Sequence, residues 1–590
     1  MHTNSPLSPS LSALLAFLAQ AIYVTFFFVP RPPQQPRSSK ARNDDMTTPD
    51  EAGTKVIAQD NASRSSSRDE EMGILTPVEN NQLKKSLKNR HLQMIAMGGA
   101  IGAGLFIGSG AALSAGGPGS VLICYTLIGI MMLFTCQALA ELSVVYPSNG
   151  AFFEHCLRFL DPTWGFAIGW GYALTWLIIL PFELIAASIT IQFWNDTINM
   201  GVWVTVFLVV LALIQIFGVR GYGEVECALS VIKIIACTGF IILGIVINTG
   251  AVGRQGYLGG EYWSDPGAFR NGFEGFASVF VIASFSFGGT ELAGLAAAES
   301  ENPEKSVPKA CKQVFWRISF FYILNLFIMG LILPSDDPRL LGSEGANSKA
   351  SPFVLAIQDA GIKVLPHIMN GVITIAVISV ANSSSFGFTR TVQAMAQVGM
   401  APTCLAKIDK QGRPVRCTIV LLLFALIAYV GLAPNDAGMK LFDWLLAVTG
   451  VTYFFIWGSI CLAHIRFRKA MEVQGLSLDL VPYKPSGGVW GSWIALIFNG
   501  VCLAAAFYVC AKPKPGATAA ETAEKFFKGY LAAPVMFVLW LGWKVKTGEW
   551  RLQTPLHAID LKTDAKFRDP VNFEPEEKKP LRKRMLGALF

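Results

Sequence analysis

The sequence predicts an all-α protein that crosses a membrane many times. Of its 590 residues, 52% are hydrophobic and only 15% are charged, whereas a soluble globular protein carries about 25% charged residues. Long apolar runs recur along the chain, and a helix needs about 20 apolar residues to span hydrocarbon. Two of these runs are interrupted by glycine near their middle, where glycine weakens a helix. These three observations predict a polytopic membrane protein.

Twelve apolar runs are predicted to be transmembrane helices. They lie at about 92–112, 120–144, 164–193, 202–218, 226–248, 272–298, 315–334, 364–389, 415–433, 441–463, 490–510 and 529–544. The loops after the sixth, eighth and tenth runs are rich in Lys and Arg, which favours a cytoplasmic location for them. The basic loop at 511–528 weakens this pattern. Both ends of the twelve-helix core are therefore predicted to be cytoplasmic.

The chain divides into a tail at 1–90, a membrane domain at 91–545 and a basic cytoplasmic tail at 546–590. Much of the first tail is rich in charge and serine, which predicts disorder. Residues 11–29 are apolar, and they fit a thirteenth span, a signal-like segment or an artefact of an upstream start codon. A start at Met46 would give an ordinary polar tail.

Composition argues against several other classes of protein. The formal charge of +7 is carried by residues in tails and short loops, so we expect no nucleic-acid partner. None of the 11 cysteines has CxxC or Cys/His ligand spacing, so we expect no metal and no cofactor. The spans contain no paired carboxylates and no Ser/His arrangement, so we expect no enzyme.

The two glycine-rich interruptions point to a binding site. Residues 98–110 read GGAIGAGLFIGSG, and residues 285–299 read FSFGGTELAGLAAAE. An unwound helix frees amide N–H groups at one half-helix end and carbonyl groups at the other. Such a site suits a zwitterion, because it offers partners for both an anion and a cation. The alternative is close helix packing through small residues.

Three long motifs carry a family resemblance. HLQMIAMGGAIGAGLFIGSG at 91–110, FSFGGTELAGLAAAESENPEKSVPKA at 285–310 and ANSSSFGFTRTVQAMAQVGMAP at 381–402 resemble the signatures of the fungal (YAT-type) amino-acid permeases. These belong to the amino acid–polyamine–organocation (APC) superfamily. The resemblance implies a LeuT-like 5+5 inverted repeat with two additional helices, and secondary amino-acid transport at the plasma membrane.

The resemblance also implies a set of substrate-binding residues. The substrate carboxylate would meet Gly102, Ala103 and Gly104, and the ammonium would meet carbonyl groups of Ala100, Phe285 and Gly288. The aromatic gate would be Phe285 or Phe287. Ser286 and Glu291 complete the predicted site, and a structural hydrogen-bond role is the alternative for Glu291. The middle residue of the first triplet is commonly Thr or Ser in the family, so Ala103 removes a hydroxyl contact.

Lys233 lies within the fifth apolar run. In sodium-coupled relatives of this fold a Na⁺ ion ties the first span to the eighth, and in proton-coupled relatives a lysine ammonium stands there. The resemblance gives that place to Lys233, with Ser383 and Ser384 as candidate oxygen partners. The alternative is a lysine that extends its side chain toward the cytoplasmic membrane surface.

Glu183 lies in the third run with about twenty apolar residues around it. A permanently ionised carboxylate would be costly there. Related permeases place a glutamate at this point, where it is implicated in proton coupling, so we expect Glu183 to load and release the coupling proton. The alternative is that Pro181 kinks the helix and Glu183 caps the freed backbone groups.

The predicted function is the import of L-amino acids by proton symport with broad specificity. Narrower substrates stay open (basic amino acids, proline, 4-aminobutyrate, a polyamine or choline), as does a non-transporting amino-acid sensor. The expected partners are an amino acid, protons and membrane lipid, with trafficking and ubiquitin machinery as candidate partners of the cytoplasmic tails. The vacuolar membrane is the alternative location.

Overall fold

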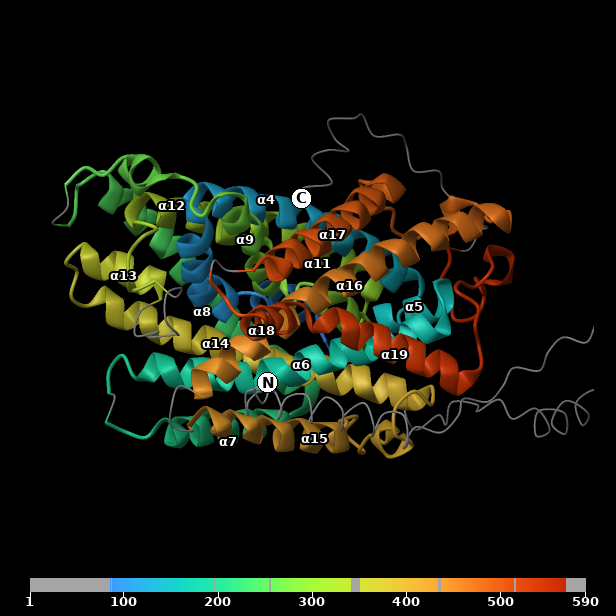
Figure 1. Ribbon diagram of the computed structural model, residues 1–590. Helices are drawn as coiled ribbons and strands as arrows, with labels where there is room; N and C mark the ends of the chain where they lie inside the picture. The colour runs from blue at the N-terminus through green and yellow to red at the C-terminus, as the bar shows by residue number, and fades with distance from the viewer. Residues whose placement is uncertain are drawn as a thin grey trace, which may run out of the picture.

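A computed structural model describes Lys85, 87–195, 197–253, 256–340, 351–432, 437–513 and 516–568, without the side chains of Met97 and of 431–448. Within these residues the chain is helical, and the one isolated bridge pairs Leu87 with Ser300 (Figure 1). The apolar segment 11–29 and residues 569–590 lie outside the described part.

The helices follow one another along the chain with short connections. The first group is α3 (Asn89–Gly98), η2 (Gly104–Gly108), α4 (Ser109–Val145), α5 (Phe152–Phe159), α6 (Pro162–Ile191), α7 (Met200–Ile216) and α8 (Gly218–Asn248). The second is η3 (Trp263–Gly267), α9 (Gly272–Phe287), α10 (Leu292–Leu295), η4 (Ala296–Glu299), α11 (Pro303–Arg317), η5 (Ile318–Leu324), α12 (Asn325–Ile332), α13 (Pro352–Asp359) and α14 (Leu365–Gln397). The third is η6 (Thr403–Ala406), α15 (Val415–Ala425), η7 (Leu426–Leu432), α16 (Ala437–Val473), η8 (Leu478–Leu480), α17 (Gly488–Ala511), α18 (Ala519–Tyr530), α19 (Ala532–Thr547) and η9 (Leu556–Ala558).

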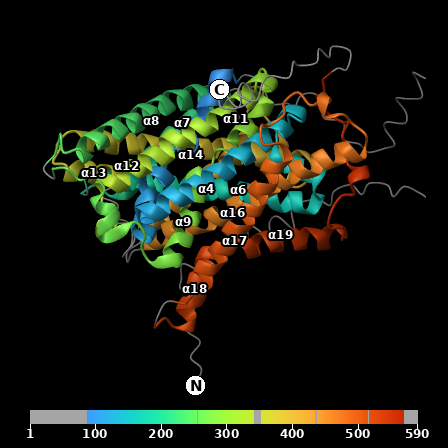
Figure 2. The same ribbon diagram turned by 90° about the horizontal axis from the view of Figure 1, so that it is seen from above.

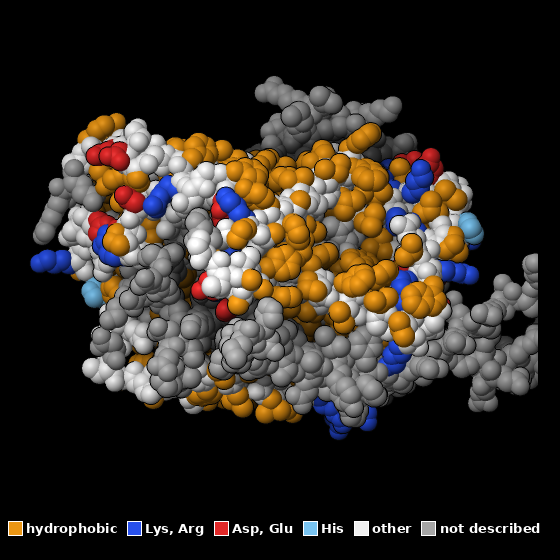
Figure 3. All heavy atoms as spheres, in the orientation of Figure 1, with side chains coloured by type: hydrophobic (Ala, Val, Ile, Leu, Met, Phe, Trp, Pro, Cys, Tyr) orange, Lys and Arg blue, Asp and Glu red, His pale blue; other side chains and the backbone are white. Residues whose placement is uncertain are grey.

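These helices are long and apolar enough to span a membrane. Eight helical stretches of the described chain meet that requirement, or nine if α18 and α19, which meet at 66°, form one span. Two shorter apolar helices, Met200–Ile216 and Val415–Val430, lie beside them. Apolar side chains cover the middle of the face drawn in Figure 3, and most of its charged side chains lie toward the two ends. This distribution is typical of a multi-pass membrane protein.

Burial separates an inner set of helices from an outer set. In α6 and in the stretch from α9 to η4, 89% of the most apolar window is buried, whereas the corresponding shares are 39% for α8 and 28% for α17. The outer helices α7 and α8 lie on one side of the bundle and α17 and α19 on the other, with α6, α14 and α16 between them (Figure 2). The inner helices therefore build the interior, and the outer helices present apolar side chains to lipid.

The first two predicted spans are joined without a loop between them. The second half of the first run continues from η2 into α4, and the two predicted runs are separated only by a kink at Gly117. Gly117 has φ of +78° and precedes Pro118, a combination that breaks the helical hydrogen-bond pattern. The kink is held by the amide N–H of Gly119, which donates to the carbonyl of Ala268 at 2.8 Å.

Segments that the charge pattern assigns to one membrane face contact one another. The amide N–H of Leu87 donates to the carbonyl of Glu299 at 3.0 Å, and that of Thr554 donates to the carbonyl of Leu160 at 2.8 Å. The guanidinium of Arg413 bonds to the carbonyl of Ile216. At the opposite side, the amide N–H of Arg270 donates to the carbonyl of Gly116 at 2.9 Å. The bundle therefore has two distinct ends, and at each end loops predicted to share a side contact one another.

The described part of the C-terminal segment packs against the membrane domain. Ile559 and Leu561 are buried, and the hydroxyl of Tyr146 donates to the carbonyl of Leu561 at 2.9 Å. Gln474 at the end of α16 donates to the carbonyls of Leu556 and Ile559, at 3.0 and 2.8 Å. Although the sequence predicted a basic tail from 546, residues up to 568 belong structurally to this end of the bundle.

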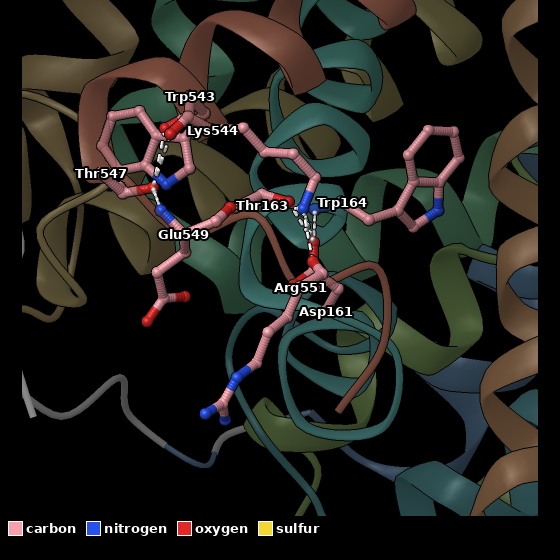
Figure 4. Close-up of polar contacts among 8 residues, drawn as sticks. All are labelled: Asp161, Thr163, Trp164, Trp543, Lys544, Thr547, Glu549 and Arg551. Atoms are coloured by element: carbon pink, nitrogen blue, oxygen red, sulfur yellow. Dashed lines mark hydrogen bonds and ion pairs between the residues drawn. The ribbon is translucent and has the colours of Figure 1, made fainter. Parts of the chain in front are cut away.

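A buried ion pair anchors this segment. Lys544 on α19 and Asp161, which caps α6, are both buried, and Lys544 Nζ lies 3.4 Å from Asp161 Oδ2. The same ammonium donates to the carbonyl of Arg551 at 2.5 Å, and Asp161 also accepts the amide N–H of Trp164 at 3.2 Å (Figure 4). One lysine therefore joins the start of α6, the end of α19 and the chain that follows it.

We expect Lys544→Met to lower the free energy of unfolding by about 3–5 kcal/mol, because the Asp161 carboxylate would be left buried without its cation. The double variant Lys544→Met/Asp161→Asn should recover much of that loss, because Asn is uncharged and still caps α6. Thermal unfolding of the detergent-solubilised protein measures both. A double variant as unstable as the single one would contradict the account.

Candidate functional site

The two glycine-rich interruptions meet inside the bundle. The first lies between the end of α3 at Gly98 and the start of η2 at Gly104, and the second lies between Phe287 and Leu292. Gly289 has φ of +94°, and a Cβ atom on it would lie 2.7 Å from the carbonyl oxygen of Gly99. Only glycine combines this backbone conformation with so close an approach. The two unwound stretches therefore pack backbone against backbone.

A narrow cavity opens beside these two stretches. Its volume is about 10 Å³, room for little more than one water molecule, and it is lined by Ala100, Gly102, Ala103, Gly104, Trp176, Ile179, Glu183, Phe285, Gly288, Val380 and Tyr453. Trp176, Ile179 and Glu183 share one face of α6, because they are three to four residues apart. Thus the inner helices α6, α14 and α16 complete the wall that the broken helices begin.

Most of the residues predicted to bind substrate lie on this wall. Those that line the cavity are Ala100, Gly102, Ala103, Gly104, Phe285 and Gly288, and Glu183, predicted for proton coupling, lines it too. Gly102 and Gly104 are needed for packing as well, since a Cβ atom would lie 2.3 Å from Val380 Cγ2 in the first case and 2.6 Å from Ser286 Cα in the second. Close packing and a cavity therefore occur together at the same glycines, and the two sequence interpretations do not exclude each other.

Phe285 and Phe287, the two predicted gate residues, point to different surroundings. Phe285 lines the cavity, and its ring meets that of Phe182 edge-on at 5.1 Å. Phe287 is fully buried and stacks on Tyr322 with 4.4 Å between ring centroids. Of the two, only Phe285 is placed to cover a bound molecule.

Ser286 and Glu291 hold the unwound stretches in place and do not line the cavity. The hydroxyl of Ser286 lies 2.9 Å from that of Tyr125. Glu291 Oε1 accepts the amide N–H of Gly289 at 3.2 Å, and its Oε2 accepts the indole N–H of Trp457 at 3.3 Å. Glu291 therefore satisfies a backbone amide that unwinding has freed, as buried polar groups require.

Tyr322 bridges the two interruptions, and the sequence did not reveal it. Its hydroxyl lies 2.9 Å from the carbonyl oxygen of Ala100 and 2.7 Å from that of Ser286. The hydroxyl has a single proton to donate, so the Ala100 carbonyl keeps at least one lone pair for another donor. Trp176 and Tyr453 are likewise unforeseen parts of the cavity wall, because glycine and charge patterns carry no information on how inner helices are rotated.

Glu183 is the ionisable group on the cavity wall. Its side chain is 1% exposed, and Oε2 has no hydrogen-bond partner among the described residues. That oxygen caps no backbone group freed by Pro181. A carboxyl oxygen without a hydrogen-bond partner is costly to bury, so an ionisable residue placed in this way within a membrane span is a candidate for function.

Lys233 is fully buried and bonds to the end of the first half-helix. Its Nζ donates to the carbonyl of Gly98 at 2.7 Å and to Ser379 Oγ at 2.8 Å. It also lies 3.8 Å from Oε1 of Glu226, another fully buried residue of α8. A cation at the C-terminal end of a half-helix is favoured by the exposed carbonyls. The ammonium thus points into the bundle and not toward the membrane surface.

Ser383 and Ser384 are near Lys233 along α14 but do not bond to it. Ser383 Oγ lies 3.3 Å from the hydroxyl of Tyr222, and Ser384 Oγ donates to the carbonyl of Ala381 at 2.7 Å. The serine that contacts Lys233 is Ser379, about one turn earlier on α14. The sequence predicted the right helix, but the exact register needed the packed structure.

The whole membrane domain matches a known family. Residues 91–556 match the family model described as amino acid permease. The amino-acid permease inda1 of Hypocrea atroviridis is 49% identical over 510 residues, which cover 85% of this chain and 88% of that protein. The cationic amino acid transporter 1 of Schizosaccharomyces pombe is 47% identical over 513 residues, or 86% of each chain.

A third relative extends the comparison. The general amino-acid permease GAP2 of Candida albicans is 47% identical over 501 residues, which cover 85% of this chain and 84% of that one. Together with the predicted motifs and the buried, glycine-broken helices, these matches identify a multi-pass membrane transporter and not an enzyme. The chain belongs to the amino acid permease family, within the fungal group of the APC superfamily.

Proposed function

We propose that the protein imports L-amino acids across the plasma membrane by proton symport, with broad specificity. The observation that carries the proposal is the position of Glu183: a carboxyl group with an unpartnered oxygen lies on the wall of the cavity that the two helix breaks form. A buried group that changes its protonation state beside a substrate can couple the movements of the two.

The proposed architecture has twelve spans in a LeuT-like 5+5 inverted repeat with two additional helices. In this scheme α3 with η2 begins the first repeat and α9 with α10 begins the second. The facing interruptions support it, because inverted repeats bring corresponding broken helices together near the bilayer midplane. The two distinct ends of the bundle support a cytoplasmic location for both ends of the membrane domain.

The substrate is proposed to bind across the two breaks. Its carboxylate would accept hydrogen bonds from the amide N–H groups of Gly102, Ala103 and Gly104, at the start of the second half-helix. Its ammonium would donate to carbonyls of Ala100, Phe285 and Gly288. With alanine at 103 no hydroxyl assists, so the anion is held by backbone alone.

Broad specificity is proposed from the chemistry of the wall. Trp176, Ile179, Val380 and Tyr453 offer apolar and aromatic surface with few fixed polar groups, and such surface discriminates weakly between side chains that differ by one or two methylene groups. A relative named a general amino-acid permease supports this choice. A narrower specificity for basic amino acids has support in a relative named a cationic amino acid transporter. Competition of labelled uptake by a panel of amino acids separates the two.

The first prediction concerns Glu183. Glu183→Gln keeps size and hydrogen bonding but cannot titrate, so the variant should lose accumulation against a gradient and retain exchange of internal for external amino acid. We expect accumulation to fall on the order of 100-fold, as for the loss of a proton-transfer group. Labelled uptake and exchange in cells measure both. Unchanged accumulation with unchanged sensitivity to uncouplers would remove Glu183 from the mechanism.

The second prediction concerns the driving ion. If the Lys233 ammonium takes the place of a coupling Na⁺ ion, uptake should be the same when external Na⁺ is replaced by N-methyl-D-glucamine. Uptake should also rise as the external pH falls, because more protons are available outside. Uptake that disappears without Na⁺ would overturn this assignment.

The third prediction concerns the close backbone approach at Gly104. A methyl group in Gly104→Ala would overlap the Ser286 backbone and force the two broken helices apart, at about 1–3 kcal/mol. We expect the apparent affinity for substrate to fall by roughly 10-fold or more, with insertion retained. Gly239→Ala on α8 is the matched control, because a Cβ atom there meets nothing within 4 Å. Equal affinity in both variants would contradict the proposed site.

A further inference from the structure

Lys233 and Glu226 are joined by an oriented chain of hydrogen bonds. The Lys233 ammonium donates to Ser379 Oγ at 2.8 Å, and the Ser379 hydroxyl donates to Glu226 Oε1 at 2.6 Å. All three side chains are fully buried. Since each donor points the same way along the chain, a proton can pass from lysine to glutamate without any rearrangement of heavy atoms.

Glu226 lies between Lys233 and one end of the bundle. It precedes Lys233 by seven residues on α8, which is about 10 Å along a helix axis. It is therefore displaced toward the end at Gly218, where α8 begins. That end carries Leu87, Glu299 and Arg413, and the charge pattern of the sequence assigns it to the cytoplasm. Oε2 of Glu226 has no hydrogen-bond partner among the described residues, so a carboxyl group that rotates after protonation can turn its O–H to this unpartnered side and release the proton to water that enters when this end opens.

The surroundings of Glu226 are otherwise poor in charge. From α14 it is faced by Ser379 and Asn382, and a Cβ atom on Gly98 of α3 would lie 2.7 Å from its Oε1. Farther toward the Gly218 end, several titratable groups are paired with one another. These pairs are His91 with Glu224 at 3.1 Å, Arg390 with Glu299 at 2.8 Å, and Tyr222 with Ser383 at 3.3 Å. Lys233 is thus the cation that Glu226 can exchange a proton with.

We propose that Glu226 is the cytoplasmic-side proton acceptor of the transport cycle and that Ser379 relays the proton to it from Lys233. The Lys233 ammonium gives one proton to Ser379 Oγ while the Ser379 hydroxyl proton moves to Glu226 Oε1. The ammonium and carboxylate become a neutral amine and a carboxylic acid, and the serine is regenerated. Glu226 then releases the proton to water when the protein opens to the cytoplasm. This inference rests on the proposed proton symport and extends it to two residues.

The transfer also changes how the first half-helix is held. A charged ammonium binds the Gly98 carbonyl about twice as strongly as a neutral amine does. Loss of the proton to Glu226 therefore loosens the contact between α8 and the end of α3. Gly98 lies directly against Glu226 and Ser230, since a Cβ atom on it would lie 2.7 Å from Glu226 Oε1 and would overlap Ser230 Oγ. Deprotonation and movement of the first broken helix are coupled by one hydrogen bond.

The test uses the full-length protein in sealed proteoliposomes with a labelled mixture of L-leucine, L-arginine and L-glutamate. Counterflow measures exchange, and accumulation driven by an imposed pH gradient measures proton coupling. We expect Glu226→Gln to retain counterflow and to lose accumulation on the order of 100-fold, with no remaining dependence on external pH. Glu226→Asp should restore part of the accumulation, because the carboxyl group can titrate again.

Ser379→Ala tests the relay with both charged groups in place. It should lower accumulation more than counterflow, and it keeps the proposal falsifiable if Glu226→Gln does not fold. The matched control is Ser230→Ala, an equally buried serine of α8 whose hydroxyl donates to the Met94 carbonyl at 3.1 Å. Ser230→Ala should show wild-type accumulation and counterflow.

Two results would overturn the inference while leaving proton symport intact. The first is wild-type accumulation and pH dependence in Glu226→Gln or in Ser379→Ala. The second is equal loss of counterflow and accumulation in folded Glu226→Gln without recovery in Glu226→Asp, which indicates that Glu226 only neutralises Lys233. If the wild-type protein itself gains no accumulation from a pH gradient, the proposed symport is wrong and the inference falls with it.

Discussion

Hydrocarbon offers no hydrogen-bond partner to a backbone amide or carbonyl, and this constraint decides where the chain can unwind. The two interruptions, at 99–103 and 288–291, are buried between inner helices and touch at Gly99 and Gly289. Some of their freed groups are satisfied by protein, since Glu291 accepts a hydrogen bond from the amide N–H of Gly289 and the Tyr322 hydroxyl lies between two carbonyls. The outer helices shield this irregular backbone from lipid. The cavity lies beside the two unwound stretches.

The same constraint explains the arrangement of buried charge. Lys233 is held at the carbonyl end of α3 and shares Ser379 with Glu226. Arg317 on α11 is also fully buried and bonds to the carbonyl of Ala96 and to Thr290 Oγ1. Each cation therefore ties an end of α3 to a neighbouring helix. A change in the charge of such a group changes what holds the first broken helix in place, which is how protonation can be converted into movement.

Much of this fold could be predicted from the sequence because its signals are local. Apolar length marks the helices, and paired glycine runs mark the two interruptions, whose meeting the structure bears out. The cavity wall nearest the glycines was expected from the family resemblance, at Ala100, Gly102, Ala103, Gly104, Phe285 and Gly288. These residues are fixed by the unwound backbone itself, so knowledge of helix rotation was not needed.

The missing parts depend on how regular helices are rotated, which apolar periodicity does not reveal when a helix is apolar all round. Phe285 and Phe287 look equivalent in the sequence, yet Phe287 packs against Tyr322. Ser379 lies one turn before the predicted pair Ser383 and Ser384 and alone bonds to Lys233. The sequence did not predict a role for Glu226, because this residue stands near the start of an apolar run, where an acidic residue normally meets water. Only the packing of α3 against α8 shows that it is buried.

The most direct test of the central claim is the internal pH of sealed vesicles that contain the purified protein and a trapped pH-sensitive dye. The medium is free of sodium, no pH gradient is imposed, and a valinomycin clamp holds the membrane potential at zero. Adding L-amino acids outside should acidify the interior at a rate proportional to labelled uptake, and D-sorbitol should have no effect. Labelled amino acid that enters at the same rate without any change in internal pH would contradict the account.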